Sequence, residues 1–293
     1  MSAQQNLVPN GSFEDTVHCP QGGGAEIYLS KFFSSPTDAT PDYFNVCALP
    51  SNFTSIPSNL GGYQYAHSGN AYGGIVCYGF GSNYKEYIQT SLSSTLEKDK
   101  FYLIEYYVSL GNISPLSCNN FGAIFSQTSI YQNNFTTLNY PTALNSNNVV
   151  NDTLNWIKIS YYYAANGDEN YLIIGNFLED ELTDTLSSGI GGAGDVYYYV
   201  DDISVTRIDY QIPNVFTPNS DLINDVWRCD FSAFNIVNCA IYNRWGNLIF
   251  QSNKQIILWD GTTKSGNNCE DGVYFYCIET EKEKYKGHIL LIR

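Results

Sequence analysis

The sequence lacks the motifs from which common enzyme families are recognised. Its 293 residues include three His and one Met, and only 15% of them are charged. A nucleophile elbow, a phosphate loop, a dinucleotide fingerprint and an H-E-x-x-H motif are all missing. No apolar run reaches the roughly eighteen residues of a membrane-spanning helix. These absences argue against an enzyme, an organic cofactor and a membrane-spanning chain.

Positive charge is also scarce, since 14 Lys and Arg stand against 29 Asp and Glu and give a net charge of −15. Residues 1–209 carry 6 basic and 20 acidic residues, whereas residues 210–293 carry 8 and 9. Such a field repels phosphate backbones and anionic lipids. Nucleic acid is therefore not an expected partner, and divalent cations are better candidates.

Aromatic residues are abundant, with 25 Tyr and 16 Phe among many Asn, Ser and Gly. This composition favours strands joined by polar turns. Four short apolar and aromatic runs are predicted to be strands: residues 101–110, 156–163, 171–177 and 196–205. Many short strands with turns between them indicate an all-β fold of the sandwich or jelly-roll type.

The length favours two domains, because a single core seldom grows beyond this size. A break falls at residues 209–213, where a strand pattern ends and a proline-bearing segment with a different charge balance begins. We therefore predict one domain over residues 1–209 and a smaller one over residues 210–293.

The eight cysteines divide evenly between the two predicted domains: Cys19, Cys47, Cys77 and Cys118, then Cys229, Cys239, Cys269 and Cys277. Even numbers favour disulfides formed outside the cytoplasm, although the spacing leaves all pairings within each domain open. Buried thiols are the alternative, and the absence of C-x-x-C disfavours a metal site. Residues 1–5 are read as the remnant of a removed signal peptide.

Several motifs follow one another after residue 212. They contain Pro213, Asn214, Phe216, Pro218, Asn219, Asn224, Asp225, Arg244, Trp245, Gly246, Trp259, Asp260, Gly261, Asp271, Gly272, Lys286, Gly287 and Arg293. From the residues alone these are turn-into-strand signals, with no catalytic pattern. In this order they resemble the gliding-motility-associated C-terminal domain, the type B sorting signal of type IX secretion in Bacteroidetes.

This resemblance implies a seven-stranded immunoglobulin-like sandwich that is read by the type IX translocon as the protein crosses the outer membrane. It also implies a partner outer-membrane protein of the PorP/SprF kind, and a secreted or outer-membrane-associated location at the cell surface.

One loop departs from the family pattern. Where the family has Gly-Asp-Gly, this chain has Ser220-Asp221-Leu222. The side chains of Asn219, Asp221, Asn224 and Asp225 offer enough oxygen atoms for a calcium ion. Loss of both glycines weakens that expectation, and solvated turn residues are the alternative.

Residues 6–14 and 199–205 resemble the first and last strands of galactose-binding-like jelly rolls, the fold of many carbohydrate-binding modules. The resemblance implies a structural calcium between Glu14 and Asp201, with Asp202 as a weaker candidate. Period-two alternation places Asp201 on the core face with Ile203 and Val205. A buried carboxylate needs a partner, and backbone amides are the alternative to calcium.

Sugar binding would require exposed aromatic rings, because a flat ring matches the apolar face of a pyranose. Candidates are Tyr63, Tyr65, Tyr72, Tyr78 and Tyr84, together with Gln64. The alternative is that these tyrosines pack the core or pair across strands. Trp156 begins a predicted strand and is expected in the core.

Three functions are consistent with these patterns. The leading one is a surface binding or adhesion protein exported by type IX secretion, with the jelly roll as a candidate glycan binder. The second is a structural or accessory subunit of an extracellular or outer-membrane assembly that binds other proteins and no sugar. The third, glycoside hydrolysis, would need two carboxylates facing each other in a cleft.

Overall fold

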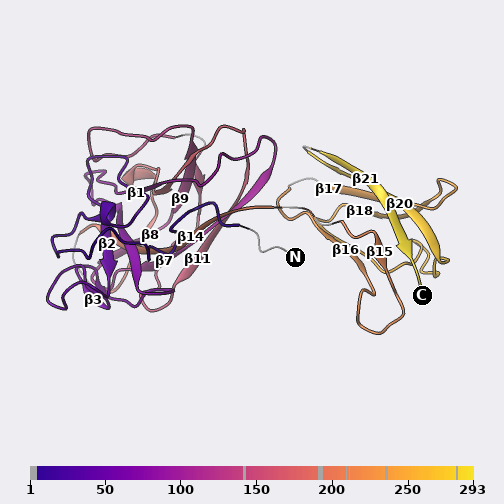
Figure 1. Ribbon diagram of the computed structural model, residues 1–293, viewed down its shortest axis with the longest axis horizontal. Coiled ribbons are helices and arrows are strands. Elements are labelled where there is room, and N and C mark those ends of the chain that lie inside the picture. The colour runs from indigo at the N-terminus through magenta and orange to yellow at the C-terminus, as the bar shows by residue number, and fades with distance from the viewer. Residues whose placement is uncertain are drawn as a thin grey trace. The chain divides into compact units, whose positions relative to one another are not determined.

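The computed structural model describes residues 5–140, 143–190, 194–208, 210, 212–234, 237–281 and 283–293. The chain divides into two compact units, Met1–Arg207 and Ile208–Arg293, which we call unit 1 and unit 2 (Figure 1). Most of the expected signal-peptide remnant, residues 1–4, lies outside the described residues, as do residues 209 and 211 at the expected domain boundary.

Unit 1 is a jelly-roll sandwich of two five-stranded antiparallel sheets. In spatial order, sheet 1 consists of β1 (Phe33–Ser34), β6 (Ile88–Ser91), β12 (Tyr171–Gly175), β9 (Gly122–Ser126) and β10 (Leu144–Asn145). Sheet 2 consists of β11 (Ile157–Ala164), β7 (Phe101–Leu110), β14 (Val196–Arg207), β5 (Ala71–Tyr78) and β2 (Asp42–Asn45). The four predicted strand runs are thereby confirmed as β7, β11, β12 and β14.

Short elements complete unit 1. They are the strand pairs β3 (Ser58–Asn59) with β4 (Gly62–Tyr63) and β8 (Leu116–Cys118) with β13 (Thr185–Ser187), and the single 3₁₀ turns η1 (Ile27–Leu29) and η2 (Asp180–Leu182). No helix among the described residues is long and apolar enough to cross a membrane.

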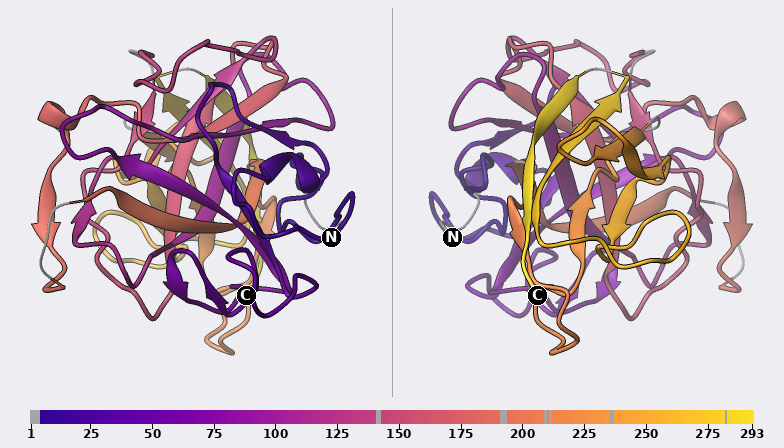
Figure 2. Two further views of the ribbon diagram at one scale, coloured as in Figure 1. Left: turned by 90° about the vertical axis from the view of Figure 1, so that its left-hand side faces the viewer. Right: turned by 90° about the vertical axis from the view of Figure 1, so that its right-hand side faces the viewer.

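Alternating residues of the long strands fill the space between the two sheets. In β7 the core side chains are Tyr102, Ile104, Tyr106, Val108 and Leu110, and all of them are buried. The left panel of Figure 2 shows the strands of unit 1 beneath the loops that surround them. Because the inner positions are large aromatic and branched residues, this core supplies most of the apolar burial of unit 1.

The predicted alternation fails at one point in β14. Tyr198 and Val200 lie in the core, and so do Ile203 and Val205, which means that the pattern shifts by one residue between them. The pairing register with β7 shifts between Asp201 and Ser204, and Asp202 takes a left-handed backbone conformation (φ 49°). This β-bulge turns Asp201 away from the core, so the prediction that it shares a face with Ile203 and Val205 is wrong.

One disulfide, between Cys19 and Cys47, lies in unit 1. The remaining six cysteines are thiols in this structure: Cys77, Cys118, Cys229, Cys239, Cys269 and Cys277. A disulfide within the first half of the chain is thereby confirmed, and the four cysteines described in unit 2 are not bridged.

Unit 2 is a smaller immunoglobulin-like sandwich of seven strands. Its larger sheet consists of β15 (Val215–Phe216), β21 (Lys284–Leu291), β20 (Gly272–Thr280), β17 (Val237–Tyr242) and β18 (Leu248–Ser252). Its smaller sheet consists of β16 (Trp227–Asp230) and β19 (Ile256–Trp259). The right panel of Figure 2 shows β20 and β21 side by side, and β15 joins the outer edge of β21 in parallel.

Candidate functional site

The face of sheet 2 that points away from the main core is divided into a covered part and an open part. In the covered part, Phe44, Tyr72, Tyr197 and Tyr199 form a second buried cluster. Residues 56–66 lie against it, and Gly61 approaches so closely that a Cβ atom there would stand 2.7 Å from the Tyr199 hydroxyl. This segment therefore fills the face on which a jelly-roll groove would otherwise open.

Tyr72, a predicted sugar platform, belongs to the covered part and is completely buried. Its hydroxyl donates to the Gln64 carbonyl (2.9 Å) and accepts from Asn59 Nδ2 (2.8 Å). Gln64 is buried as well, with Nε2 donating to Ser109 Oγ at 2.6 Å. Neither side chain offers an exposed surface, because both serve to hold residues 56–66 on the sheet.

Tyr63 and Tyr65, in contrast, project outward with 56% and 62% of their surface exposed. Their rings are perpendicular, with centroids 5.7 Å apart, and their hydroxyls lie 3.2 Å apart. Asn112 Oδ1 accepts the Tyr63 amide proton at 2.6 Å and fixes the backbone beneath the pair. The alternation of residues 63–65, out, in and out, presents both rings on one side.

Three further aromatic side chains extend this pair. Trp156 Nε1 donates to the Tyr65 carbonyl (3.0 Å), and its ring lies 6.1 Å from His67. His67 stacks on Tyr107 with centroids 3.7 Å apart and an interplanar angle of 19°. Trp156 is half-buried, and its ring packs on the second buried cluster with its centroid 5.7 Å from that of Tyr72, so it lies at the border of that cluster and outside the main core. We call Tyr63, Tyr65, His67, Tyr107 and Trp156 the aromatic strip.

Polar groups border the aromatic strip. Asp202 Oδ2 lies 2.5 Å from His67 Nδ1 and orients the ring that stacks on Tyr107. On the neighbouring strand, Lys158 is the register partner of Tyr107, and its ammonium pairs with Glu105 at 2.8 Å. Negatively and positively charged hydrogen-bonding groups therefore lie beside the exposed rings.

Tyr78 and Tyr84, the remaining predicted platforms, are half-buried and are engaged elsewhere. The Tyr78 ring lies 5.3 Å from the Lys85 ammonium. The Tyr84 hydroxyl donates to Glu86 Oε1 at 2.8 Å, and its ring packs 5.6 Å from Phe135. No contact between these two rings and the aromatic strip is described.

Glu14 and Asp201, the predicted calcium ligands, both hold the turn that follows the aromatic strip. Asp201 Oδ2 accepts the His67 and Ser68 amide protons (2.9 and 3.2 Å), and Glu14 Oε1 accepts the Asn70 amide proton (2.7 Å). Burial, and then the charge of Asp202, raise the pKa of Asp201 to about 8. Both carboxylates thus accept hydrogen bonds from backbone amides, which was the alternative to calcium binding.

Calcium in unit 1 stays a prediction. Glu14 and Asp202 line a polar surface groove of about 790 Å³. Among the described residues, however, no group of three or more His, Cys, Asp or Glu side chains is arranged to hold a metal ion. A cation here would need backbone carbonyl oxygens as further ligands.

In the second predicted calcium loop, the side-chain oxygens accept hydrogen bonds from backbone amides of the same loop. Asp225 accepts the amide protons of Ser220 (2.6 Å) and Leu222 (2.8 Å), and Asp221 Oδ1 accepts that of Ile223 (2.8 Å). Asn219 Oδ1 accepts the Asp221 amide proton in the same way. These are turn contacts, as the alternative expected, and calcium binding by Asn219, Asp221, Asn224 and Asp225 stays a prediction.

The two positions of that loop where the family has glycine keep the left-handed backbone conformation that glycine favours. Ser220 and Leu222 both take left-handed backbone angles, with φ of 68° and 70°. These are the two positions where the chain departs from the family's Gly-Asp-Gly pattern. The backbone path that glycine favours is therefore retained by residues with a Cβ atom, at a cost in strain.

Most sorting-motif residues have structural roles in unit 2. The Phe216 and Trp259 rings are buried with centroids 5.2 Å apart. Gly261 (φ 78°) has no room for a Cβ atom beside Leu291, and its carbonyl accepts from Arg293 Nη2 at 3.1 Å. These residues hold the core and the turns of the unit.

Other motif residues lie at turns and strand edges. The Leu290 amide donates to the Asn214 carbonyl (2.8 Å). Arg244 Nη2 lies beside Gly272, and the Arg293 amide donates to Asp271 Oδ2 at 3.2 Å. Pro213, Pro218 and Asp260 also lie outside the strands, and the Pro213 carbonyl accepts from Trp227 Nε1 at 2.6 Å. Lys286 and Gly287 lie within β21, where they pair with Cys277 and Tyr276 of β20.

Trp245 differs from the other motif aromatics because 80% of its surface is exposed. It lies in a tight turn in which Asn243 Oδ1 accepts the amide protons of Trp245 and Asn247, both at 3.0 Å, while Gly246 takes φ 80°. The turn needs Asn243 and Gly246, but no ring of the described part of unit 2 packs against the exposed indole to explain a tryptophan.

Two buried acids of unit 1 were not anticipated as a pair. Asp42 and Glu86 are both buried, and burial followed by the charge of Asp42 raises the pKa of Glu86 to about 7. Tyr197 donates to Asp42, and Tyr84 donates to Glu86. Because both carboxylates are covered, they do not form the open cleft that glycoside hydrolysis would need.

Comparison with known proteins gives a family for unit 2. Residues 210–291 match the CHU_C type IX secretion signal domain. The resemblance expected from the ordered motifs is therefore confirmed for this segment, and it indicates export to the cell surface or beyond. No curated protein matches the chain in sequence.

Solved structures give distant likenesses. One is PorZ, a surface component of the type IX secretion system of Porphyromonas gingivalis (16% identity, TM-score 0.24, 32% of this chain and 14% of PorZ). Another is the CBM22-1 xylan-binding domain of Paenibacillus barcinonensis Xyn10C (13% identity, TM-score 0.36, 71% of this chain and 98% of that domain). A third is the K1 cleaved adhesin domain of Lys-gingipain from P. gingivalis W83 (13% identity, TM-score 0.33, 68% of this chain and 96% of that domain). At these values the likenesses carry no inference about what this chain binds.

Proposed function

We propose that this protein, whose residues 210–291 are a type IX secretion signal domain, is a non-enzymatic binding protein of the cell surface that recognises glycans through the aromatic strip of unit 1. The observation that carries the proposal is the exposure of Tyr63 and Tyr65 beside Trp156, His67 and Tyr107. Tyrosine rings that are more than half exposed, next to a stacked histidine, indicate a surface kept for contact rather than for folding.

The chemistry of the strip suits a sugar. Aromatic faces match the apolar C–H faces of pyranose rings, and tyrosine hydroxyls keep a polar tip toward water. The carboxylates of Asp202 and Glu105 and the Lys158 ammonium can accept and donate bonds to hydroxyl groups at the border. The arrangement therefore combines ring platforms with directional polar contacts.

Charge narrows the class of glycan. The first 209 residues carry 6 basic against 20 acidic residues, and this negative field repels sulfated and uronate-rich polysaccharides. Neutral glycans are the class that the surface supports best.

The test is a glycan array probed with the full chain, with calcium and with chelator. Tyr65→Ala should abolish binding, whereas Tyr28→Ala should not, because Tyr28 has the same 62% exposure but lies in η1, outside the aromatic strip. Equal loss in both variants, or no binding to any glycan by a folded chain, would refute the glycan proposal. Loss with chelator alone would support the calcium prediction.

A protein ligand is the second candidate, and one observation favours it. Residues 56–66 cover the sheet face, so the strip projects from a covered surface. Such a surface fits an accessory subunit of an extracellular assembly that binds no sugar. Absence of glycan binding, with Tyr65→Ala releasing a co-purifying surface protein that Tyr28→Ala retains, would establish this alternative.

For unit 2, we propose that Trp245 contacts the type IX translocon or a PorP/SprF-like outer-membrane protein. The support is that its indole is 80% exposed within a sorting motif and has no packing role in the described part of the unit. Recognition by an exposed tryptophan is typical of protein contact sites.

A further inference from the structure

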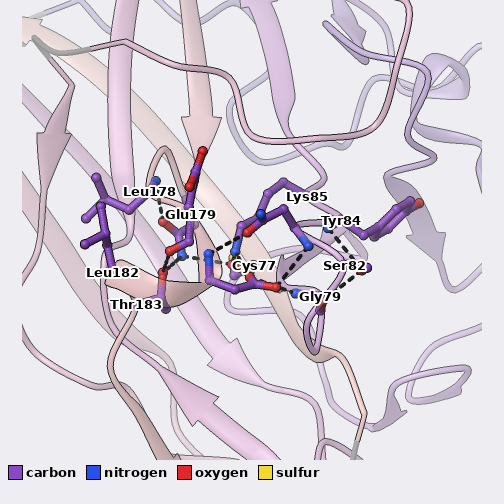
Figure 3. Close-up of polar contacts among 12 residues, drawn as sticks. Cys77, Gly79, Ser82, Tyr84, Lys85, Leu178, Glu179, Leu182 and Thr183 are labelled. Carbon is purple, nitrogen blue, oxygen red and sulfur yellow. Dashed lines mark hydrogen bonds and ion pairs between the residues drawn. The ribbon is translucent and has the colours of Figure 1, made fainter.

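Unit 1 buries a lysine completely. The Lys85 side chain is 0% exposed, and its ammonium lies 2.6 Å from Asp180 Oδ1, whose side chain is 8% exposed. The ammonium also donates to the Cys77 carbonyl at 2.9 Å. In Figure 3, Lys85 lies between the turn that follows β5 and residues 178–183. Both charges have lost their contact with water, which makes the ionised pair costly to bury.

The Asp180 carboxyl group is fixed in orientation. The Gly79 amide donates to Oδ1 (3.3 Å), and the Asn83 amide donates to Oδ2 (3.0 Å). Asn83 Oδ1 in turn accepts the Asp180 amide proton at 2.7 Å. Amide donors placed on both oxygens stabilise the negative charge that develops when a nucleophile adds to a carboxyl carbon.

The surroundings also restrict the lysine. Asn176 is buried, and its Nδ2 donates to the same Cys77 carbonyl (2.9 Å) and to Thr183 Oγ1 (3.0 Å). The Tyr78 ring lies 5.3 Å from the Lys85 ammonium. The amine is thus held against one carboxyl group, in a site with little access for water, where the effective concentration of two reacting groups can reach roughly 10⁵–10⁸ M.

From this geometry we propose that Lys85 and Asp180 join in an isopeptide bond. One proton of Nζ passes to the carboxylate that it contacts, which frees the lone pair of the amine for attack. Nζ then attacks Cγ, which forms the C–N bond and breaks one C–O bond. The oxygen leaves as water with two of the three protons that Nζ carried, and one remains on the amide. The step is redox-neutral and needs no cofactor.

The cross-link would replace two buried charges by one neutral amide. It would also close a covalent ring from residue 85 to residue 180, tying the turn after β5 to η2. A pulling force on unit 1 could then not extend residues 86–179, which is an advantage for a protein displayed outside the cell.

The test is the intact mass of the full chain after reduction and denaturation. We expect a mass lower by one water than the sequence requires, and a branched peptide that contains both Lys85 and Asp180 after digestion. Lys85→Arg should restore the full mass, because the guanidinium does not form this bond. Lys158→Arg is the matched control, since it alters an exposed lysine–carboxylate pair, and it should leave the deficit unchanged.

Two results would overturn the proposal. One is full mass in the folded wild-type chain, with Lys85 and Asp180 recovered in separate linear peptides. The other is a water deficit that maps to an Asp-Gly step such as Asp260-Gly261 or Asp271-Gly272, where a cyclic imide forms and is reopened by mild base. The wild-type measurement alone decides the question, even if Lys85→Arg does not fold.

Discussion

The Tyr197 hydroxyl donates a 2.6 Å hydrogen bond to Asp42 Oδ2 and so links the central strand β14 to the edge strand β2. Strand β5 lies between them, and the tyrosine crosses it over Gly74, where a Cβ atom would stand 1.9 Å from the hydroxyl oxygen. The buried carboxylate of the edge strand thus receives its hydrogen bond only because Gly74, its register partner in the neighbouring strand, leaves room for the tyrosine side chain.

We therefore expect Gly74→Ala to destabilise unit 1 by about 3 kcal/mol or more, because the added methyl group displaces Tyr197 and leaves Asp42 without its donor. Chemical denaturation followed by tyrosine fluorescence measures the loss. Gly23→Ala is the control, since no atom lies within 4 Å of its Cβ position, and its effect should stay within about 0.5 kcal/mol. Equal stability of the two variants would show that the crossing is not constrained.

Stability should fall as the pH rises from about 4.5 to 7. The pKa of Glu86 is raised from 4.5 to about 7 in the folded chain, so in this window the folded chain holds a proton that the unfolded chain releases. The free energy of unfolding then decreases by about 2–3 kcal/mol toward neutral pH. Asp201, with a pKa raised to about 8, extends the decrease to higher pH.

Urea unfolding at several pH values between 5 and 8 tests this dependence. Glu86→Gln should reduce the slope to the part that Asp201 contributes, because it removes one of the two titrating groups and keeps the shape of the side chain. The exposed Glu181→Gln should keep the wild-type slope. A stability that rises with pH in the wild-type chain would contradict the burial of Glu86 as an acid.

Leu222→Gly should stabilise unit 2 by about 0.5–1 kcal/mol. Leu222 has φ 70° and is 94% exposed, so glycine relieves the left-handed strain without removing buried surface. Leu222→Ala separates the two effects, because it removes the exposed side chain but keeps the Cβ atom, and it should leave stability unchanged. Equal gains from both variants would place the benefit in the side chain instead of the backbone.

Trp245→Ala should block export and leave the fold intact. The exposed indole contributes little to stability, so the melting temperature of unit 2 should change by no more than a few degrees. Fractionation of the native host should find the variant retained inside the outer membrane. Phe275→Ala, which truncates another exposed aromatic of the same unit, should be exported normally. Normal export of Trp245→Ala would exclude the indole as a contact.

Much of the fold could be predicted because it depends on short-range patterns. Runs of aromatic and branched residues such as 101–110 favour strands, and β7 occupies this run from end to end. The motifs after residue 212 predicted turns that lead into strands from the residues alone, and the number of seven strands came from their resemblance to the type B sorting domain. Five plus two strands are present, with Gly246 and Gly261 at left-handed turns.

The candidate site was less predictable because it depends on how distant segments meet. Alternation alone could not reveal the bulge at Asp202, which reverses the face of Asp201. Nor could it show that residues 56–66 fold onto the sheet and bury Tyr72 while Tyr63 and Tyr65 remain outside. The depth of Lys85 was also missed, since a lysine followed by a glutamate in a polar segment is usually solvent-facing.

The parallel pairing of β15 with β21 has a consequence for biosynthesis. Val215 and Phe216 find their register against Leu290 and Leu291, so the first strand of unit 2 has no neighbour until the ribosome has passed residue 291. A prematurely terminated polypeptide would emerge with this edge open and the domain unfinished. Pairing of β15 with β21 therefore occurs only in a chain whose unit 1 has already been translated. Machinery that recognises folded unit 2 would for this reason export full-length chains and leave truncated ones behind.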